Sequence, residues 1–431
     1  MQRQLWTSGL KRPKYKTLEA DISCEILVIG GGMAGILTAY LLTVSGHDVV
    51  LVEGKSIGGG ITQRTTAVIT AQHDTLYSDL IAQHGYDNAK SYLEANLEAL
   101  NTYKTLARDI DCDFEEKPSY MYSLDLDLTG EIQVLASLGF KALIQTSLPL
   151  PFGVKSAVEF PHMAQFHPLK FLFAIASRLR IYENTFVRKI TERTAETDRF
   201  KISFQKAVVA THFPFINRTG FFFGKMFQQR SYVAALENAA DFDGTYIDDT
   251  GFGLFFRNYD KYLLVGNGAH RTGTGTTAVE KMHSFIEEYF PRARIAYEWS
   301  NQDCVTLDSI PYIGRYGSFK DIYVLTGFNL WGMTGSMVGA RILDDLISDR
   351  SNSFSATFQP KRSLWRKQFW TNAGSSIVNL VNFKTKRCPH LGCALKYNRQ
   401  EHTWDCPCHG SRFDDEGKLL TNPAMKDARI E

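Results

Sequence analysis

Long apolar segments are absent from this chain of 431 residues, and no stretch approaches the ~18 consecutive apolar residues of a transmembrane helix. The first residues also lack the apolar core of a secretory signal peptide. The charges nearly balance, with 48 basic and 46 acidic side chains and a net charge of +2, which gives no nucleic-acid footprint. We therefore expect a soluble cytoplasmic protein with no membrane span and no nucleic-acid partner.

Cysteine is scarce, with seven in the chain, and four of the seven fall between Cys388 and Cys408. The other three, Cys24, Cys112 and Cys304, are scattered. This usage differs from the disulfide framework of a small secreted protein and is typical of a metal site. The length allows two or three domains, and 44% hydrophobic with 22% charged residues is ordinary for a globular enzyme.

Two short loops near the C-terminus contain Cys388 and His390, then Cys406 and His409, with fifteen residues between the loops. Each loop offers one thiolate and one imidazole, which suits a two-iron two-sulfur cluster with two cysteines on one iron and two histidines on the other. Zinc also binds cysteine and histidine, but structural zinc motifs usually space the ligands of one loop more widely. We predict an iron–sulfur cluster on these four residues, with a zinc site or a decayed site as the alternative.

The full loops, CPHLGC (388–393) and CPCHGS (406–411), resemble those of the Rieske iron–sulfur family. In respiratory members of that family the two additional cysteines join the loops, so the resemblance implies a disulfide between Cys393 and Cys408. Such a cluster carries one electron at a time.

The resemblance also bears on the redox potential. It implies that the Ser411 hydroxyl donates to a cluster sulfur, which raises the potential, whereas Phe413 stands where high-potential members have a tyrosine donor. We therefore expect a potential below that of the respiratory proteins. Family domains normally have several strands before the first loop, but the preceding segment shows no alternating strand pattern. Apolar residues over 369–383 instead favour one or two helical turns, so the module is expected to be shortened.

The N-terminal part contains a dinucleotide fingerprint. An apolar strand at 25–29 leads into the turn GGGMAG and then into an apolar helix. Gly30 allows the tight turn, Gly32 lets the backbone approach a pyrophosphate, and Gly35 lets the helix pack on the strand. A second strand ends at Glu53, about where the acid that binds a ribose belongs.

Two further segments indicate which dinucleotide binds. The loop IGGGITQRTTA (57–67) resembles the second FAD contact of the D-amino-acid oxidase and glycine oxidase superfamily, and a nicotinamide domain has no such loop. The segments at 307–314 and 327–334 resemble the closing motif of the same superfamily, in which a helix N-terminus faces the flavin pyrimidine. The FAD contacts expected from this resemblance are Gly30, Gly32, Met33, Ala34, Gly35, Glu53, Arg64, Thr65, Thr66, Val187, Gly327, Gly332, Met333 and Thr334.

The fold class implied is α/β: a Rossmann-type, glutathione-reductase-like FAD-binding domain with an inserted α+β substrate domain, followed by a small β-rich Rieske module. Helical spacing of apolar residues predicts one or two amphipathic helices over 76–110, and the sequence also predicts a strand over 181–190. The expected boundaries are 20–350 for the oxidoreductase region (FAD-binding about 20–75, 158–212 and 301–350; substrate domain about 76–157 and 213–300), 351–384 for a linker and 385–431 for the Rieske module.

The catalytic residues are unknown from the sequence. Amino-acid-oxidising members of the superfamily have an arginine before the Asp-x-x-Pro-x-x-Gly motif that clamps the substrate carboxylate. Here Asp303 stands at about that position, where it would repel a carboxylate. Arg257 is a candidate for a replacement charge or for a salt bridge, and His73 and His270 are candidates for proton transfer or for hydrogen-bonded structural roles.

These features predict an FAD-dependent oxidoreductase that oxidises a small molecule, an amine or a related C–N or C–H bond. Electrons would exchange between FAD and a Rieske two-iron two-sulfur cluster, with a protein electron donor or acceptor as a partner. The alternative is a non-catalytic electron-transfer or redox-sensing flavo-iron-sulfur protein, which the missing arginine favours. In a third hypothesis the cluster only stabilises the fold.

Overall fold

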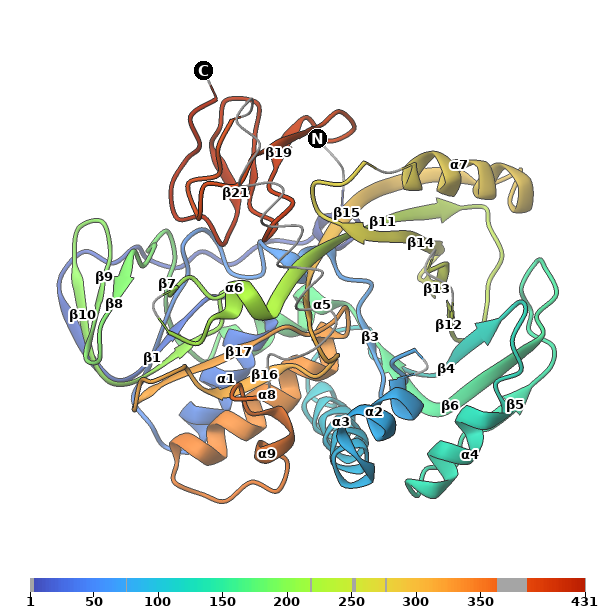
Figure 1. The fold of residues 1–431 in the computed structure, drawn as a ribbon, viewed down its shortest axis with the longest axis horizontal. Helices are drawn as coiled ribbons and strands as arrows, with labels where there is room; N and C mark the ends of the chain where they lie inside the picture. The colour runs from blue at the N-terminus through green and yellow to red at the C-terminus, as the bar shows by residue number, and fades with distance from the viewer. Residues whose placement is uncertain are drawn as a thin grey trace.

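Three β-sheets organise the computed structural model (Figure 1). Within the described residues, eight strands form one sheet, nine form a second, and four form a small sheet near the C-terminus. The expected α/β class with a small β-rich C-terminal module is confirmed. The structure describes residues 4–74, 76–217, 219–249, 253–275, 277–362 and 386–430.

The first sheet has a parallel centre made of apolar strands. Strands β1 and β2 are buried along most or all of their length, which is typical of a parallel sheet covered on both faces. Because the central strands are parallel, the carboxyl ends of β1, β2 and β10 meet at one edge. The main path is β16 (Tyr312–Arg315), β17 (Ile322–Thr326), β10 (Lys201–Val209), β1 (Ile22–Ile29), β2 (Val49–Val52) and β7 (Arg180–Tyr182), with β9 (Thr194–Glu196) beside β10 and β8 (Lys189–Ile190) beside β9.

One strand prediction for this sheet is wrong. The single strand expected over 181–190 is two short strands, β7 and β8, separated by a turn in which Asn184 has a φ of 49°. Asparagine tolerates this left-handed conformation better than most residues, so the chain changes direction there. Residues 185–188, which follow Asn184, line the large cavity described below.

Helices cover the first sheet and fill the space between the sheets. α1 (Met33–Val44) and α8 (Gly332–Ile347) pack against each other in one apolar cluster that also includes buried side chains of β1. The prediction of one or two amphipathic helices over 76–110 is confirmed, and the structure has two, α2 (Leu76–His84) and α3 (Tyr86–Ala107). The remaining helices are η1 (Leu5–Thr7), η2 (Ile61–Arg64), α4 (Thr129–Ser137), α5 (Pro168–Ala176), α6 (Phe222–Lys225), α7 (Ala278–Tyr289) and α9 (Ser355–Phe358).

The second sheet forms the right-hand part of Figure 1 and includes the aromatic-rich segment 213–300. One of its strands, β6, covers residues that the sequence analysis placed partly in an FAD-binding segment beginning at 158. Its order is β15 (Arg294–Thr306), β11 (Met226–Glu237), β14 (Tyr262–Arg271), β13 (Phe255–Tyr259), β12 (Thr245–Asp248), β4 (Glu115–Ser123), β6 (Ser156–Gln165) and β3 (Val68–Ile69), with β5 (Leu143–Gln145) beside β6.

The C-terminal module is an antiparallel sheet of very short strands, drawn in red in Figure 1. Its buried apolar cluster has eight members, and four of them are cysteines. The helical turns expected over 369–383 lie outside the described residues, as does most of the expected linker. The strands are β18 (Lys396–Asn398), β19 (Thr403–Asp405), β20 (Arg412–Phe413) and β21 (Leu419–Thr421).

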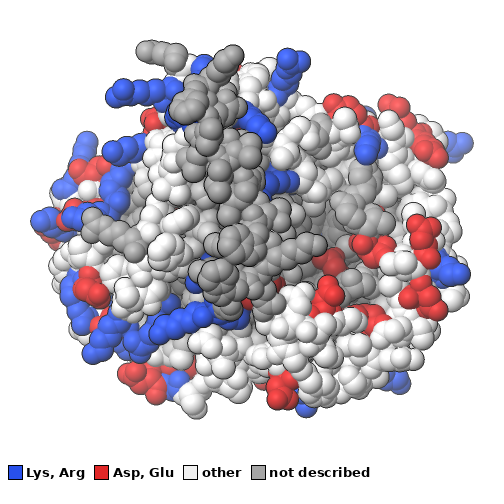
Figure 2. Space-filling view, in the orientation of Figure 1, with Lys and Arg blue, Asp and Glu red and all other residues white. Residues whose placement is uncertain are grey.

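The surface charges differ between the two large sheets. On the face shown in Figure 2, Lys and Arg gather over the left part, where the first sheet lies, and Asp and Glu over the right part, where the second sheet lies. Within the described residues, none of the helices combines the length and apolar character needed to cross a membrane.

Candidate flavin and cluster sites

The dinucleotide turn lies where β1 meets α1. Gly30 has a φ of 114°, and a Cβ atom there would lie 2.5 Å from the Ala210 carbonyl oxygen, so only glycine fits. A Cβ atom at Gly35 would lie 1.9 Å from the carbonyl oxygen of Gly30, which shows how closely α1 approaches the turn. At Gly32, by contrast, the nearest atom to such a Cβ is the Thr62 Oγ1 at 3.5 Å. The backbone at the N-terminus of α1 is therefore open to an anionic group.

Glu53 follows β2 and lies beside this turn. Its carboxylate accepts hydrogen bonds from the backbone N–H groups of Gly31 (2.7 Å) and Lys55 (2.8 Å). Burial raises the pKa of Glu53, and these backbone bonds oppose that shift. The carboxylate is thus held in one orientation at the position where a ribose hydroxyl group would be recognised.

A cavity of about 1570 Å³ begins at this turn and extends to the second sheet and to the C-terminal module. Its volume exceeds that of most small-ligand pockets, about 300–1,000 Å³, as a dinucleotide together with a substrate requires. Gly35, Gly327 and Thr334 lie behind its wall. The predicted FAD residues that line it are Gly30, Gly32, Met33, Ala34, Glu53, Arg64, Thr65, Thr66, Val187, Gly332 and Met333.

Strands β11 and β15 lie against both the cavity and the C-terminal module. They pair along most of their length, with Gln229 opposite Asp303 and Arg230 opposite Gln302. Since side chains alternate along a strand, Gln229 and Asp303 lie on one face of this ribbon and Arg230 and Gln302 on the other. All four line the cavity, and Arg230 and Gln302 also hydrogen-bond the module. The same two strands therefore contact both candidate sites.

Carboxylates line the cavity on the side of the second sheet. Asp303 is buried, accepts a hydrogen bond from the Asn301 Nδ2 at 2.9 Å, and has its pKa raised to about 7 by burial. Burial also raises the pKa of Asp74 to about 6; a bond from Trp331 opposes this shift and the nearby Asp248 adds to it. Asp249 lines the cavity as well. This wall suits a cationic ligand better than a carboxylate.

The candidate Arg257 lies outside the cavity lining. Its Nη1 donates to the carbonyl oxygens of Thr66 (2.6 Å) and Ala67 (2.9 Å), and its guanidinium lies over the Trp6 ring. Complete burial lowers the pKa of Arg257 to about 9. These contacts support a role in holding the 66–67 loop rather than the replacement carboxylate clamp that the sequence suggested.

The histidine candidates also lie behind the cavity wall. His73 is fully buried, with its Nδ1 2.8 Å from the Tyr92 hydroxyl and its Nε2 2.9 Å from the Thr70 carbonyl oxygen, and burial lowers its pKa to about 3. His73 is therefore neutral at pH 7, and its ring stacks on Trp331, which does line the cavity. The His270 Nδ1 bonds the Gly268 carbonyl oxygen at 2.9 Å. The hydrogen bonds of His73 and His270 support structural roles for both histidines rather than proton transfer.

The four predicted cluster ligands converge in the C-terminal module. The rings of His390 and His409 have centroids 5.0 Å apart and are nearly perpendicular, at 89°. Within the described residues, the Nδ1 atom of each ring is buried without a hydrogen-bond partner, and the thiols of Cys388 and Cys406 bond each other. A pair of unpartnered imidazole nitrogens and a pair of bonded thiols within one module fit a cluster with one imidazole pair and one thiolate pair.

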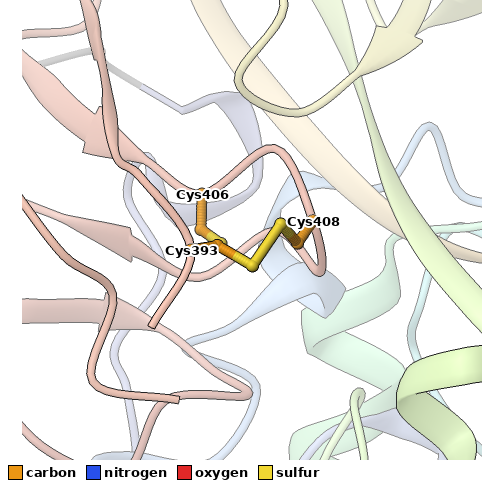
Figure 3. Close-up of side chains that lie close together, drawn as sticks. All are labelled: Cys393, Cys406 and Cys408. Carbon is orange, nitrogen blue, oxygen red and sulfur yellow. A yellow bond between two sulfur atoms is a disulfide. The ribbon is translucent and has the colours of Figure 1, made fainter. Parts of the chain in front are cut away.

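The remaining two cysteines of the module form a disulfide. Figure 3 shows Cys393, Cys406 and Cys408 together, and a bond joins the sulfurs of Cys393 and Cys408. The three sulfur atoms lie within 4.8 Å of one another, but the disulfide leaves only Cys406 of this group as a metal ligand. The Ser411 side chain hydrogen-bonds the Cys388 thiol, and Phe413 is fully buried.

A buried charge network, which was not predicted from the sequence, holds the module against strands β11 and β15. Glu401 accepts from the Arg230 Nε at 2.9 Å, from the Ser300 hydroxyl at 2.9 Å and from the Arg412 Nη2 at 2.8 Å. The side chains of Arg230 and Glu401 are only 1% and 7% exposed. An arginine within an otherwise buried strand was the only sequence signal, and it did not identify a partner 171 positions away.

Backbone contacts bring the second ligand loop onto the same ribbon. The side-chain amide of Gln228 donates to the His409 carbonyl oxygen at 2.7 Å, and that of Gln302 donates to the Gly410 carbonyl oxygen at 2.7 Å. The His390 Nε2 lies 3.1 Å from the Asn217 Oδ1. The cluster loops are therefore positioned by residues of the oxidoreductase region.

Comparisons with known proteins agree with this geometry. Residues 25–346 match the family described as DAO, FAD dependent oxidoreductase, and residues 364–430 match the Rieske [2Fe-2S] domain. The chain belongs to the FAD-dependent oxidoreductase family. It is an oxidoreductase whose cofactors are FAD and a two-iron two-sulfur cluster. The Rieske match begins before residue 385, where the sequence analysis started the module.

Relatives resemble the whole chain or its larger part. A putative Rieske 2Fe-2S iron-sulfur protein, YhfW of Bacillus subtilis (strain 168), is 32% identical over 493 residues, covering 98% of this chain and 96% of the relative. Gamma-glutamylputrescine oxidoreductase of Escherichia coli (strain K12) is 21% identical over 395 residues, covering 81% and 89%. The crystal structure of glycine oxidase from Geobacillus kaustophilus superposes with a TM-score of 0.66 at 18% identity, covering 79% of this chain and 99% of that chain, which shows a shared fold.

Proposed function

We propose that this protein oxidises a small cationic amine in the cavity and that FAD exchanges the resulting electrons with the Rieske cluster of the same chain. The observation that carries the proposal is the acidic cavity wall, with Asp303 at about the position where amino-acid oxidases have their arginine clamp. The size of the cavity favours an enzyme over the non-catalytic alternative.

The substrate class follows from the charges of the lining. Asp74, Asp248, Asp249 and Asp303 line the cavity, and a substrate carboxylate there would meet like charge. An ammonium group would instead be attracted, and the acidic surface over the second sheet in Figure 2 favours the approach of cations. One relative is named for a putrescine derivative, which is consistent with an amine substrate.

The chain's own residues have distinct tasks in this proposal. Bound FAD supplies the hydride-accepting chemistry that oxidises a C–N bond. Asp303, with a pKa of about 7, holds the ammonium group and accepts its proton. The Asn301 amide orients that carboxylate, and the N-terminus of α8 at Gly332 directs its positive dipole end into the cavity.

The position of the cluster histidines supports electron exchange within the chain. The His409 ring lies against Phe213 (centroids 6.4 Å apart) and Phe223 (6.1 Å), and it also bonds the Phe223 backbone. Phe213 directly follows His212, which lines the cavity. Since the histidine-ligated iron is the exposed side of Rieske proteins, this edge of the cluster faces the flavin-binding region.

The test is an anaerobic titration of the holoprotein with a series of alkylamines and, separately, α-amino acids. We expect an amine to bleach the flavin and to reduce the cluster in the same sample, and Asp303→Asn to raise the required amine concentration about tenfold. Asp243→Asn, which changes an exposed carboxylate of the second-sheet region, is the matched control and should behave as wild type. Flavin reduction by amino acids alone, unaffected by Asp303→Asn, would refute the substrate proposal.

A further inference from the structure

The last hairpin of the C-terminal module forms one wall of the large cavity. Strand β21 and the residues after it line the same cavity as Glu53, which is expected to bind a ribose of FAD, and Val187, another expected FAD contact. We call this end of the cavity the adenosine end. We propose that segment 418–427 is part of the FAD site and closes over its ADP half, so that tight FAD binding requires the docked module. This inference concerns cofactor binding and is independent of the proposed electron exchange. The segment residues that line the cavity are Lys418, Leu419, Leu420, Thr421, Asn422, Met425, Lys426 and Asp427.

Direct contacts hold this segment at the adenosine end. The Lys55 ammonium group donates to the Leu420 carbonyl oxygen at 3.4 Å, and the backbone N–H of Lys55 donates to Glu53. The Arg188 Nη1 donates to the Met425 carbonyl oxygen at 2.8 Å. Thus residues directly beside Glu53 and Val187 hydrogen-bond the module.

Arg188 is itself oriented for this contact. Its Nε and Nη2 donate to the two carboxylate oxygens of Asp198 at 2.7 and 3.1 Å, a bidentate arrangement that fixes the plane of the guanidinium. Asp198 also lines the cavity. Residues after β7 and residues of the module therefore both contribute to this wall of the cavity.

Asn422 connects the segment to the dinucleotide turn. The Asn422 Nδ2 donates to the backbone carbonyl oxygens of Thr211 (2.7 Å) and Phe213 (2.6 Å). The backbone carbonyl oxygen of Asn422 accepts from the Gln228 Nε2 at 3.0 Å. Thr211 follows Ala210, the residue whose backbone packs against the turn glycine Gly30. One amide side chain thereby fixes the end of β10 and the position of the hairpin together.

The physical consequence is coupling between FAD binding and docking of the module. A cofactor that contacts both walls binds the docked state better than the undocked state, so it stabilises docking by the same factor by which docking strengthens its binding. Loss of the hairpin contacts would leave the adenosine end of the cavity open to water.

The first test compares two amide deletions in the full-length, cluster-containing protein after removal of FAD. Asn422→Ala removes the contacts to Thr211 and Phe213, which follow β10. Gln400→Ala removes another contact of the module, to Glu280 Oε1 at 2.7 Å, away from the cavity lining. We expect the Kd for FAD, measured by quenching of flavin fluorescence, to rise about tenfold for Asn422→Ala and to stay within about twofold of wild type for Gln400→Ala. Unchanged affinity in Asn422→Ala, or an equal loss in both variants, would overturn the proposal.

A second test uses the wild-type protein and so does not depend on the folding of a variant. FAD added to the flavin-free protein should slow amide hydrogen exchange in segment 418–427 and leave exchange in 396–399, at the opposite end of the module sheet, unchanged. No slowing in 418–427 would overturn the proposal. Failure of electron exchange would alter neither measurement, so the two proposals can fail separately.

Discussion

The first sheet and the C-terminal module are stabilised in different ways. The first sheet has parallel strands whose apolar side chains belong to two large clusters, one on each face. The module has strands of two or three residues and a cluster of eight buried apolar side chains, half of them cysteine. Such a small core supplies little folding free energy by burial alone. The module instead depends on its disulfide, its cluster and its contacts with the rest of the chain.

The module is joined to the FAD-binding region by buried charged contacts. Buried charges at the interface are unusual, and here they come from both parts, with Arg230 on β11 and Glu401 and Arg412 in the module. A pair of this kind specifies one docked geometry more than it adds net stability. A fixed geometry is what electron exchange between two centres and a shared cofactor wall both need.

The largest expected effect comes from removing a cluster ligand. Cys406→Ser should abolish the electron paramagnetic resonance signal of the reduced cluster and destabilise the module, while reduction of the flavin by an amine continues when FAD is supplied in excess. Cys112→Ser, at a buried thiol of the oxidoreductase region, is the control and should keep the signal. A cluster signal that persists in Cys406→Ser would contradict the ligand assignment.

Breaking the buried charge network should have the next largest effect. Glu401→Gln leaves Arg230 and Arg412 with reduced compensation, which we expect to cost about 3–5 kcal/mol of unfolding free energy, measured by urea denaturation. The control Glu94→Gln removes an exposed helical pair with Lys90 and should cost about 0.5 kcal/mol or less. Similar small losses in both variants would show that the interface is not held by these charges.

The same network predicts an acid transition. Burial acts to raise the pKa of Glu401, but Arg230 and Arg412 outweigh it and lower the pKa to about 2, from an ordinary value of 4.5. The stabilising contribution is therefore complete above pH 4.5 and is lost as the pH falls through about 2. The unfolding free energy, measured by urea denaturation at each pH across this range, should fall in wild type and change less with pH in Glu401→Gln. Equal pH dependence of the unfolding free energy in the two proteins would contradict the prediction.

A smaller effect, on the pH dependence of catalysis, is expected from substitution of Asp303. Because burial raises the pKa of Asp303 to about 7, kcat/KM for an amine should rise with pH through about 7 as the carboxylate ionises. Asp303→Asn should remove this limb of the profile. A limb that remains in Asp303→Asn would assign it to another group.

The smallest expected effect concerns the cluster potential. Phe413 is fully buried beside the module's cysteines, so Phe413→Tyr introduces a hydroxyl close to the cluster. A new hydrogen bond to a cluster sulfur should raise the reduction potential, measured by redox titration. Ser411→Ala should lower it, since Ser411 bonds the Cys388 thiol. Shifts of the opposite sign would contradict this account.

Features set by residues close together in the chain could be predicted from the sequence, whereas contacts between distant residues could not. The turn at Gly30, the helices over 76–110 and the two ligand loops depend on local spacing, and the structure contains them. Contacts between distant residues left no local pattern: Arg257 proved to hold a loop, and the partnership of Arg230 with Glu401 was not anticipated. The break between β7 and β8 was missed even though the polar residues Glu183, Asn184 and Thr185 interrupt the apolar pattern there.

The central claim is tested most directly by rapid-freeze electron paramagnetic resonance after anaerobic mixing of the holoprotein with an amine that bleaches its flavin. We expect the signal of the reduced Rieske cluster to grow as the flavin is reduced, without any added mediator. A flavin that becomes fully reduced while the cluster stays oxidised would contradict electron exchange within the chain.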